Sequence, residues 1–142
     1  MGLLQIVLDT NVLVSGLRSR RGYAFQLLHM VGNKYFDINL SVPLVLEYED
    51  VLYRPELKLP VTNSIVEQVI SYHCSVAHHH RIFFLWRPFL PDAKDDMVLE
   101  LAVKAQCRYI VTYNKRDFRG VEQFGLQALT PKELLESIGV IL

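Results

Sequence analysis

The sequence is poor in several features that define common protein classes. Its two cysteines, Cys74 and Cys107, form no CxxC pair, so we expect buried free thiols rather than a disulfide. Its seven glycines form neither a GxGxxG motif nor a Walker A loop, which argues against the common dinucleotide and nucleotide sites. Fifteen Lys and Arg balance fifteen Asp and Glu. This balance excludes a broadly basic, histone-like coat but leaves room for a local basic patch.

No apolar run is long enough to span a membrane. The stretch from Leu3 to Leu17 is interrupted by polar residues, namely Gln5, Asp9, Thr10, Asn11 and Ser15. A membrane span needs about 20 apolar residues. The first residues also show neither the basic start nor the cleavage site of a signal peptide. We therefore expect a cytoplasmic protein with no membrane contact.

The composition is that of one globular unit. The chain has 142 residues, of which 51% are hydrophobic and 21% are charged. Its mean hydropathy is +0.18. A chain of this size buries roughly two-thirds of its surface, and single domains cluster near this length. We expect a single domain over residues 1–142.

Short apolar runs alternate with helical patterns along the chain. The segments predicted to be strands are Leu3–Leu8, Phe36–Leu40, Ile82–Trp86, Tyr109–Thr112 and Leu126–Leu129. The segments predicted to be helices are Gly22–Val31, Pro43–Tyr53, Thr62–His78, Asp95–Gln106 and a last helix with Thr130, Pro131 and Glu133 at its start. This order predicts an α/β, three-layer domain with a parallel sheet of four to five strands and helices on both faces.

Acidic residues recur where the predicted strands end. Asp9 follows the first strand directly, and the other acids are Glu47, Glu49 and Asp50, then Asp92, Asp95 and Asp96, and finally Asp117. In open parallel sheets the ligand site lies beyond the carboxyl ends of the strands. Acids that converge there raise one another's pKa, and a divalent cation removes that repulsion. Oxygen ligands without His or Cys favour Mg²⁺ or Mn²⁺.

Each of these residues also has a purely local interpretation. Asp9 could cap a helix or form a turn, and Glu47 could lie on a solvated helix face. Asp95 and Asp96 could complement a helix N-terminus. Asn114 and Asp117 could be turn residues. The prediction of a metal site therefore depends on their joint placement.

Four segments, in chain order, resemble the PIN domain family. They are VLDTNVLVSGL, EYEDVL with the following Arg54-Pro55, DDMVLELA and VTYNKRDF. The resemblance covers nearly the whole chain and points to the bacterial and archaeal toxins of toxin–antitoxin pairs, relatives of VapC. It implies an endoribonuclease that uses one or two Mg²⁺ or Mn²⁺ ions. It also implies RNA as the substrate, a cognate antitoxin protein as a partner, and a homodimer.

The resemblance also implies site residues by position. Asp9, Glu47 and Asp96 match the first three acids of the family, with Glu49 as the alternative to Glu47. Asn114 stands where many relatives carry Asp, and Asp117 is the alternative fourth acid. The implied catalytic and metal-binding set is Asp9, Glu47, Asp96 and Asp117, and the surrounding polar groups are Asn11, Thr112, Asn114 and Asp95.

Two basic groups flank the predicted site. Arg18, Arg20 and Arg21 are placed in the loop after the Asp9 turn, and Lys115 and Arg116 lie beside Asp117. They are candidates for contacts with RNA phosphates. Ordinary solvated charge is the alternative for each of them.

The run His78-His79-His80 is predicted to lie at a helix end. Neighbouring residues of a helix point about 100° apart, so three adjacent histidines would not face one ion. Partial positive charge is favourable at a helix C-terminus.

Other functions remain to be weighed against a ribonuclease. A phosphotransfer enzyme of the haloacid dehalogenase type needs Asp-x-Asp after the first strand, and here Asn11 takes the second position. A PIN fold that only binds RNA or a partner protein is the stronger rival. The presence of Asp9, Glu47 and Asp96 argues against it.

Overall fold

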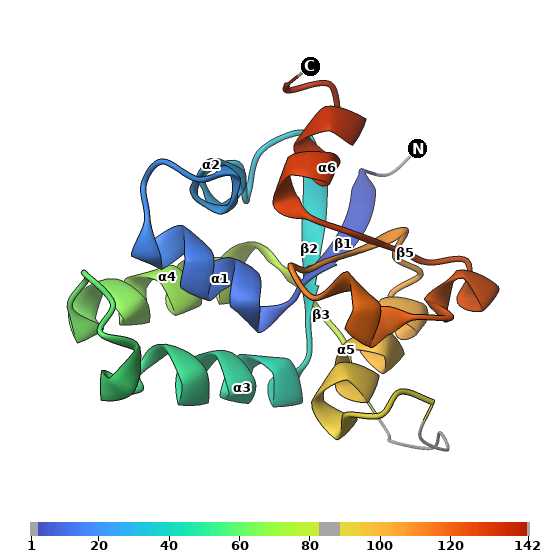
Figure 1. Cartoon of the computed structure of the whole chain (residues 1–142), viewed down its shortest axis with the longest axis horizontal. Coiled ribbons are helices and arrows are strands. Elements are labelled where there is room, and N and C mark those ends of the chain that lie inside the picture. The colour runs from blue at the N-terminus through green and yellow to red at the C-terminus, as the bar shows by residue number, and fades with distance from the viewer. Residues whose placement is uncertain (1–2, 83–88, 142) are drawn as a thin grey trace.

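The computed structural model of the chain describes residues 3–82 and 89–141. In these residues five parallel strands form a sheet in the order β3-β2-β1-β4-β5, flanked by six α-helices (Figure 1). The strands are β1 Leu4–Leu8, β2 Phe36–Leu40, β3 His78–His79, β4 Tyr109–Val111 and β5 Gln127–Leu129. The predicted α/β fold with a parallel sheet is confirmed.

Strand β1 lies at the centre of the sheet. It pairs with β2 on one side, where Ile6 faces Ile38, and with β4 on the other, where Leu8 faces Val111. Burial on both faces explains the nearly continuous apolar run of β1. Because β1 and β4 end side by side, the residues that follow them, Asp9 and Thr112, are brought together.

The first helix, α1 (Thr10–Arg18), was not predicted from the sequence. Its β-branched residues and Gly16 have low helix propensity. It forms because the Asp9 side chain caps it and because its inner face, with Val12 and Leu13, is buried. Arg18 is therefore the last residue of a helix and does not lie in a loop, which corrects that expectation.

Four other helices lie close to their predicted positions. They are α2 (Tyr23–His29), α3 (Val42–Leu52), α5 (Ala93–Lys104) and α6 (Pro131–Ser137). The capping box of α6 is confirmed, since Thr130 Oγ1 accepts from the Glu133 amide and the Glu133 carboxylate accepts from the Thr130 amide.

The third strand differs from the prediction. Helix α4 (Asn63–Val76) ends before the histidines, and His78 and His79 form β3 at the edge of the sheet. The His80 amide extends this pairing by donating to the Leu40 carbonyl at 2.9 Å. The helix-end placement of the histidines was wrong, because backbone pairing with β2 determines their structure. Ile82 lies outside any strand, and residues 83–86 of the predicted strand fall outside the described residues.

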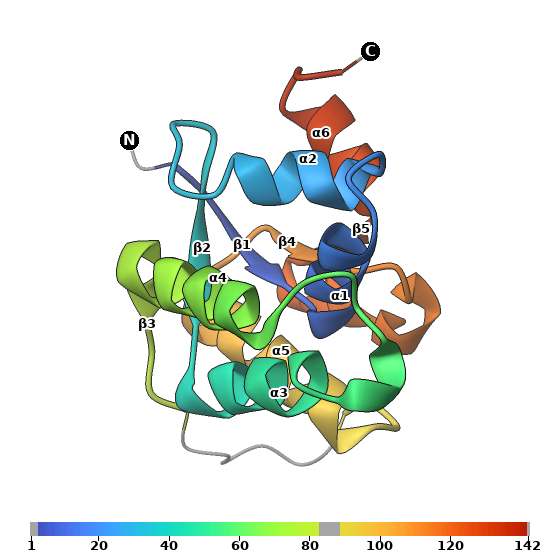
Figure 2. The ribbon, with the colours of Figure 1, turned by 90° about the vertical axis from the view of Figure 1, so that its left-hand side faces the viewer.

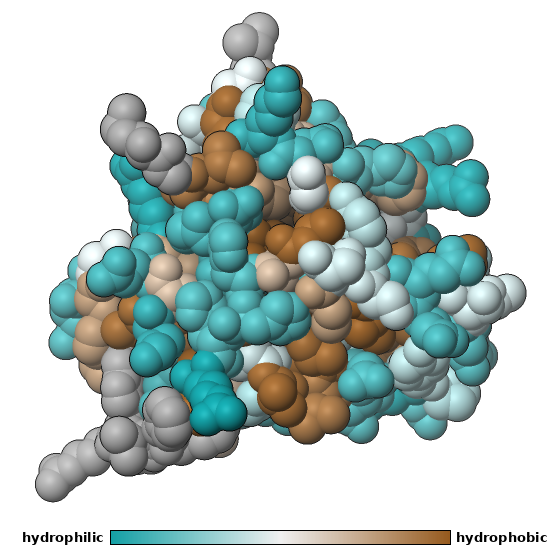
Figure 3. Space-filling view, turned by 180° about the vertical axis from the view of Figure 1, so that it is seen from behind, coloured by the Kyte–Doolittle hydropathy of each residue, from teal (hydrophilic) through white to brown (hydrophobic). Residues whose placement is uncertain are grey.

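The helices pack against the sheet and against one another. Helix α5 packs against β1, β2 and β4, whereas α4 packs against β2 and lies between α2 and α3 (Figure 2). Seen from behind, hydrophobic side chains reach the surface in scattered groups among hydrophilic ones (Figure 3). Both cysteines are free, Cys107 buried and Cys74 half-buried. Within the described ranges no helix is long and apolar enough to cross a membrane.

Candidate functional site

Asp9 is the most tightly held acid at the carboxyl edge of the sheet. Its side chain is buried, at 8% exposure. One carboxylate oxygen accepts from the Thr10 amide at 2.9 Å, and the other accepts from Thr112 Oγ1 at 2.9 Å and Asn11 Nδ2 at 3.3 Å. Its own amide donates to the Val111 carbonyl at 2.9 Å. The carboxylate position is thus fixed from both β1 and β4.

Three of the four polar residues predicted around Asp9, namely Asn11, Thr112 and Asn114, form one connected network. Asn11 Nδ2 also donates to Thr112 Oγ1 at 3.2 Å, while Asn11 Oδ1 accepts from the Tyr113 amide at 3.1 Å. Asn114 joins through its backbone, whose amide donates to Thr112 Oγ1 at 3.0 Å. This network ties the start of α1 to the turn after β4 and makes the edge rigid around Asp9.

Glu47 approaches the same edge from α3. Its carboxylate accepts a hydrogen bond from Thr10 Oγ1, and the Thr10 amide donates to Asp9, so Thr10 links the two acids. The neighbouring Tyr48 is buried, and its hydroxyl donates to the Leu8 carbonyl. Burial, together with the charges of Asp9 and Glu47, raises the pKa of Tyr48 well above its usual value. Thr10 and Tyr48 were not predicted; the only sequence signal is that each stands next to a predicted acid.

The two adjacent aspartates of α5 point to different surroundings. The Asp96 carboxylate accepts from the amides of Phe89 and Leu90, at 3.1 and 2.8 Å, and so holds the segment before the helix. Asp95 interacts with the charges of Asp9, Glu47 and Asp117. The structure therefore brings Asp95, placed around the ligand set in the sequence analysis, to the acid cluster, and it places the Asp96 carboxylate on backbone amides.

Asp117 completes the cluster from the other side. It lies exposed on the short 3₁₀ turn Lys115–Phe118, and its charge raises the pKa of both Asp9 and Asp95. We use "acid cluster" below for Asp9, Glu47, Asp95 and Asp117.

Electrostatic repulsion is visible in two members of the acid cluster. Burial raises the pKa of Asp9, opposed by its hydrogen bonds to Thr112 and Thr10 and reinforced by Glu47 and Asp117. Burial and then the charges of Asp9, Asp92, Asp117 and Glu47 raise the pKa of Asp95 to about 7. The ion pairs within residues 3–82 and 89–141 join other partners: Arg54 with Asp50, His78 with Asp37, and Lys115 with Glu133. The repulsion is thus not offset by a basic side chain in that part of the chain.

The side chains of the acid cluster are of the chemical type that binds a hard divalent cation. All four acids offer carboxylate oxygens, the ligands that Mg²⁺ and Mn²⁺ prefer. Their mutual repulsion is what a cation would relieve. In the described part of the chain, however, no three His, Cys, Asp or Glu side chains converge closely enough to hold one ion together. Three members of the acid cluster therefore do not converge on one point as they stand, and holding an ion between three of them requires side chains to move.

The basic residues predicted to contact RNA have varied environments. Arg18 donates to the Leu57 carbonyl at 3.1 Å, and the Arg21 amide donates to Ser19 Oγ at 3.2 Å. Arg20 lines an apolar cavity away from the acid cluster. Lys115 pairs with Glu133 at 2.9 Å. Arg116 is exposed on the turn that carries Asp117.

Comparison with known families decides the assignment. A family model described as "PIN domain" matches residues 5–116, which is more than half of the chain. The chain belongs to the PIN domain family. PIN domains are generally nuclease domains and generally use divalent metal ions. The matched range includes three members of the acid cluster and ends one residue before Asp117. No curated protein matches the sequence significantly.

Proposed function

We propose that this PIN domain is a Mg²⁺- or Mn²⁺-dependent endoribonuclease whose active site is the acid cluster. The observation that carries the proposal is that Asp9, Glu47, Asp95 and Asp117 interact electrostatically at the carboxyl edge of a parallel sheet, where burial and these charges raise the pKa of Asp95 to about 7. Open parallel sheets place their ligand sites at this edge. Membership of the PIN family supports nuclease chemistry there.

The ligand set that we propose replaces Asp96 by Asp95. Asp96 Oδ1 accepts hydrogen bonds from the Phe89 and Leu90 amides, whereas the Asp95 carboxylate interacts with the charges of the other acids. Asp9 and Asp95 would hold the ion, with Asp117 as a further ligand. When bound, a divalent ion lowers the pKa of a coordinated water and polarises a phosphoryl oxygen.

The remaining residues have supporting roles in this proposal. Glu47, held by Thr10, would orient the attacking water or accept its proton. Thr112 and Asn11 would keep Asp9 ionised and fixed, because each donates a hydrogen bond to its carboxylate. Tyr48 anchors α3 to the end of β1 through the Leu8 carbonyl and so sets the position of Glu47.

The biological role that we propose is the toxin of a toxin–antitoxin pair. PIN nucleases act on RNA and often pair with antitoxins. In this role the partners are RNA, a cognate antitoxin protein and a second copy of the chain. Induced expression should then arrest growth in the wild type but not in the Asp9→Asn variant.

A cleavage assay tests the enzyme directly. We expect the purified chain to cut single-stranded RNA with Mg²⁺ or Mn²⁺ and to lose this activity in EDTA. Asp9→Asn and Asp95→Asn should lower the rate by orders of magnitude, whereas Asp96→Asn, which keeps an accepting oxygen for the loop amides, should retain most of it. RNA binding without cleavage under any metal condition would instead support a domain that only binds RNA.

A further inference from the structure

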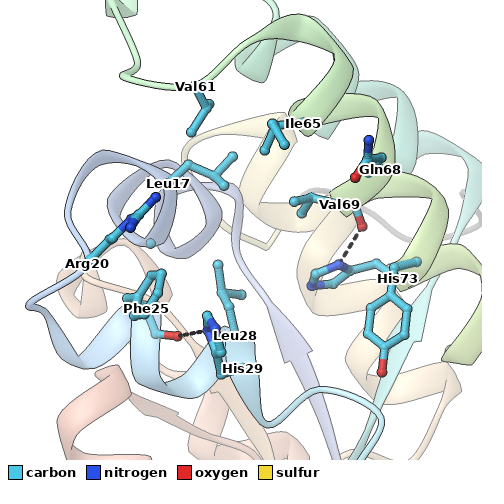
Figure 4. Close-up of a pocket in the computed structure, with 12 residues that line it drawn as sticks. Leu17, Arg20, Phe25, Leu28, His29, Val61, Ile65, Gln68, Val69 and His73 are labelled. Carbon is cyan, nitrogen blue, oxygen red and sulfur yellow. Dashed lines mark hydrogen bonds between the residues drawn. The ribbon is translucent and has the colours of Figure 1, made fainter.

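An apolar cavity of about 380 Å³ lies between α1, α2 and α4 (Figure 4). Leu17 of α1 and Phe25 and Leu28 of α2 form one wall, and Ile65 and Val69 of α4 form the other. Its volume falls in the range of small-molecule sites, roughly 300–1,000 Å³. The cavity adjoins the C-terminal half of α1, whereas the acid cluster adjoins the opposite end of that helix.

One buried polar atom faces this apolar space. His73 is only 3% exposed, and its ring extends from α4 toward Leu28 across the cavity (Figure 4). Its Nδ1 lies 2.8 Å from the Val69 carbonyl, which can only accept, so Nδ1 carries the hydrogen. Nε2 is then a bare acceptor, and no described residue donates to it. Leaving a buried acceptor unpaired is unfavourable, and a ligand that donates to it removes that penalty.

Two neighbouring polar side chains of the cavity are already engaged. The Tyr72 hydroxyl donates to the Val31 carbonyl at 2.9 Å. Gln68 Nε2 donates to Ser64 Oγ at 3.5 Å. His29 makes the same contact to its own helix as His73 does, with Nδ1 3.2 Å from the Phe25 carbonyl, but it is exposed. Burial lowers the pKa of His73, which keeps its ring neutral and Nε2 available as an acceptor.

We propose that this cavity binds a small, predominantly apolar aromatic molecule that carries one hydroxyl or N–H donor, and that the donor bonds to Nε2 of His73. The apolar walls select the body of the ligand, and the single buried acceptor selects its one donor. The proposal does not depend on the acid cluster or on ribonuclease activity.

The test compares two probes of nearly equal shape on the full chain. β-Naphthol has a hydroxyl donor, and methyl β-naphthyl ether has none. We expect calorimetry or a fluorescence titration to show β-naphthol binding about 5- to 10-fold more tightly, the effect of one hydrogen bond of about 1 kcal/mol. In His73→Leu the two probes should bind equally well. In the matched control His29→Leu the preference for β-naphthol should remain.

Three results would overturn the proposal. They are equal affinity of the two probes for the wild type, a preference that survives in His73→Leu, and no binding of either probe at about millimolar concentration. Nitrogen NMR of the wild type provides a measurement that does not depend on the folding of a variant. The Nε2 resonance of His73 should move upfield with β-naphthol, as expected for a ring nitrogen that accepts a hydrogen bond, and should not do so with the ether.

Discussion

Asp95 and Asp96 are neighbours in the chain but differ in what they do for the fold. The Asp96 carboxylate accepts two backbone amides at 3.1 and 2.8 Å and stabilises the approach to α5. Asp95 lies half-buried beside other acids, and its pKa of about 7 shows that the fold holds it against electrostatic cost. Residues that are held at such a cost are candidates for function.

This difference predicts unlike responses to divalent metal. Mn²⁺ should raise the Tm of the wild type, because the ion binds the folded acid cluster and not the unfolded chain. The rise should be smaller in Asp95→Asn and in Asp9→Asn, and close to that of the wild type in Asp96→Asn. Thermal unfolding with and without Mn²⁺ measures it. An unchanged rise in Asp95→Asn together with a lost rise in Asp96→Asn would restore Asp96 as the ligand.

The raised pKa of Asp95 also predicts a pH dependence of stability without metal. Between the unfolded value of 3.8 and the folded value of about 7, the folded state binds more protons than the unfolded state. The contribution of Asp95 to stability therefore falls as the pH rises through this window. Asp95→Asn should be more stable than the wild type at pH 8 by on the order of 1 kcal/mol, less than the full shift implies because solvent screens a half-exposed group.

Urea unfolding in EDTA at pH 4 and pH 8 measures this difference. Near pH 4 the two proteins should be nearly equally stable, and Asp96→Asn serves as the control because its carboxylate is hydrogen-bonded to amides. A wild type that gains stability relative to Asp95→Asn as the pH rises would contradict the prediction.

The sequence could not distinguish the roles of these two residues. Met97 through Ala102 are all buried, so the hydrophobic pattern of α5 does not indicate which of its faces meets the other acids. The resemblance to the PIN family left Asp95 and Asp96 as adjacent candidates. Only their contacts in the structure distinguish the role of one from that of the other. Asp9 was easier to place, because the end of a buried central strand fixes its position.

At the scale of elements, the well-predicted parts have strong local signals. The apolar run of β1 and the capping box of α6 are visible in the residues themselves. Helix α1 has only its cap residue Asp9 as a local signal, and strand β3 has none. Their structures depend on contacts with distant segments: Asp9 is held by Thr112, and His78 pairs with Asn39 in β2. Tertiary contacts of this kind override local propensity.

The turn between α2 and β2 offers an element-scale prediction. Gly32 has φ +89°, and a Cβ there would overlap the Oη of Tyr72. Tyr72 in turn fixes α4 by donating to the Val31 carbonyl. Gly32→Ala should therefore lower the free energy of unfolding by about 1–3 kcal/mol.

Gly22, at the start of α2, provides the matched control. Its φ is −87°, and a Cβ there would come no closer than 4.0 Å to Ala24 N. Gly22→Ala should change the stability by less than about 1 kcal/mol. Chemical denaturation of the two variants measures the difference, and equal losses would show that the turn does not constrain α4.

At the scale of the whole molecule, the parallel topology accounts for most of what the sequence predicts about function. Residues far apart in the chain, such as Asp9 and Thr112, meet because parallel strands end at the same edge. The basic residues follow no such rule. Their partners depend on side-chain geometry, as the pairing of Lys115 with Glu133 shows.

The balanced overall charge makes RNA binding depend on a few local cations. Because fifteen basic and fifteen acidic residues give no net charge, the whole molecule does not attract RNA over long range. Each exposed cation near the acid cluster is therefore important for RNA binding. Arg116 is exposed on the turn of Asp117, whereas the adjacent Lys115 is paired with Glu133 at 2.9 Å.

We expect Arg116→Ala to weaken RNA binding and to lower the slope of log K against log salt by about 0.7, the effect of one lost phosphate contact on a single strand. Lys115→Ala should change the slope less, because Glu133 already neutralises its charge. Fluorescence anisotropy across a salt series, in an Asp9→Asn background that leaves the RNA intact, compares the two. Equal slopes for the two variants would show that Arg116 contributes no more to RNA binding than Lys115 does, and would contradict the prediction.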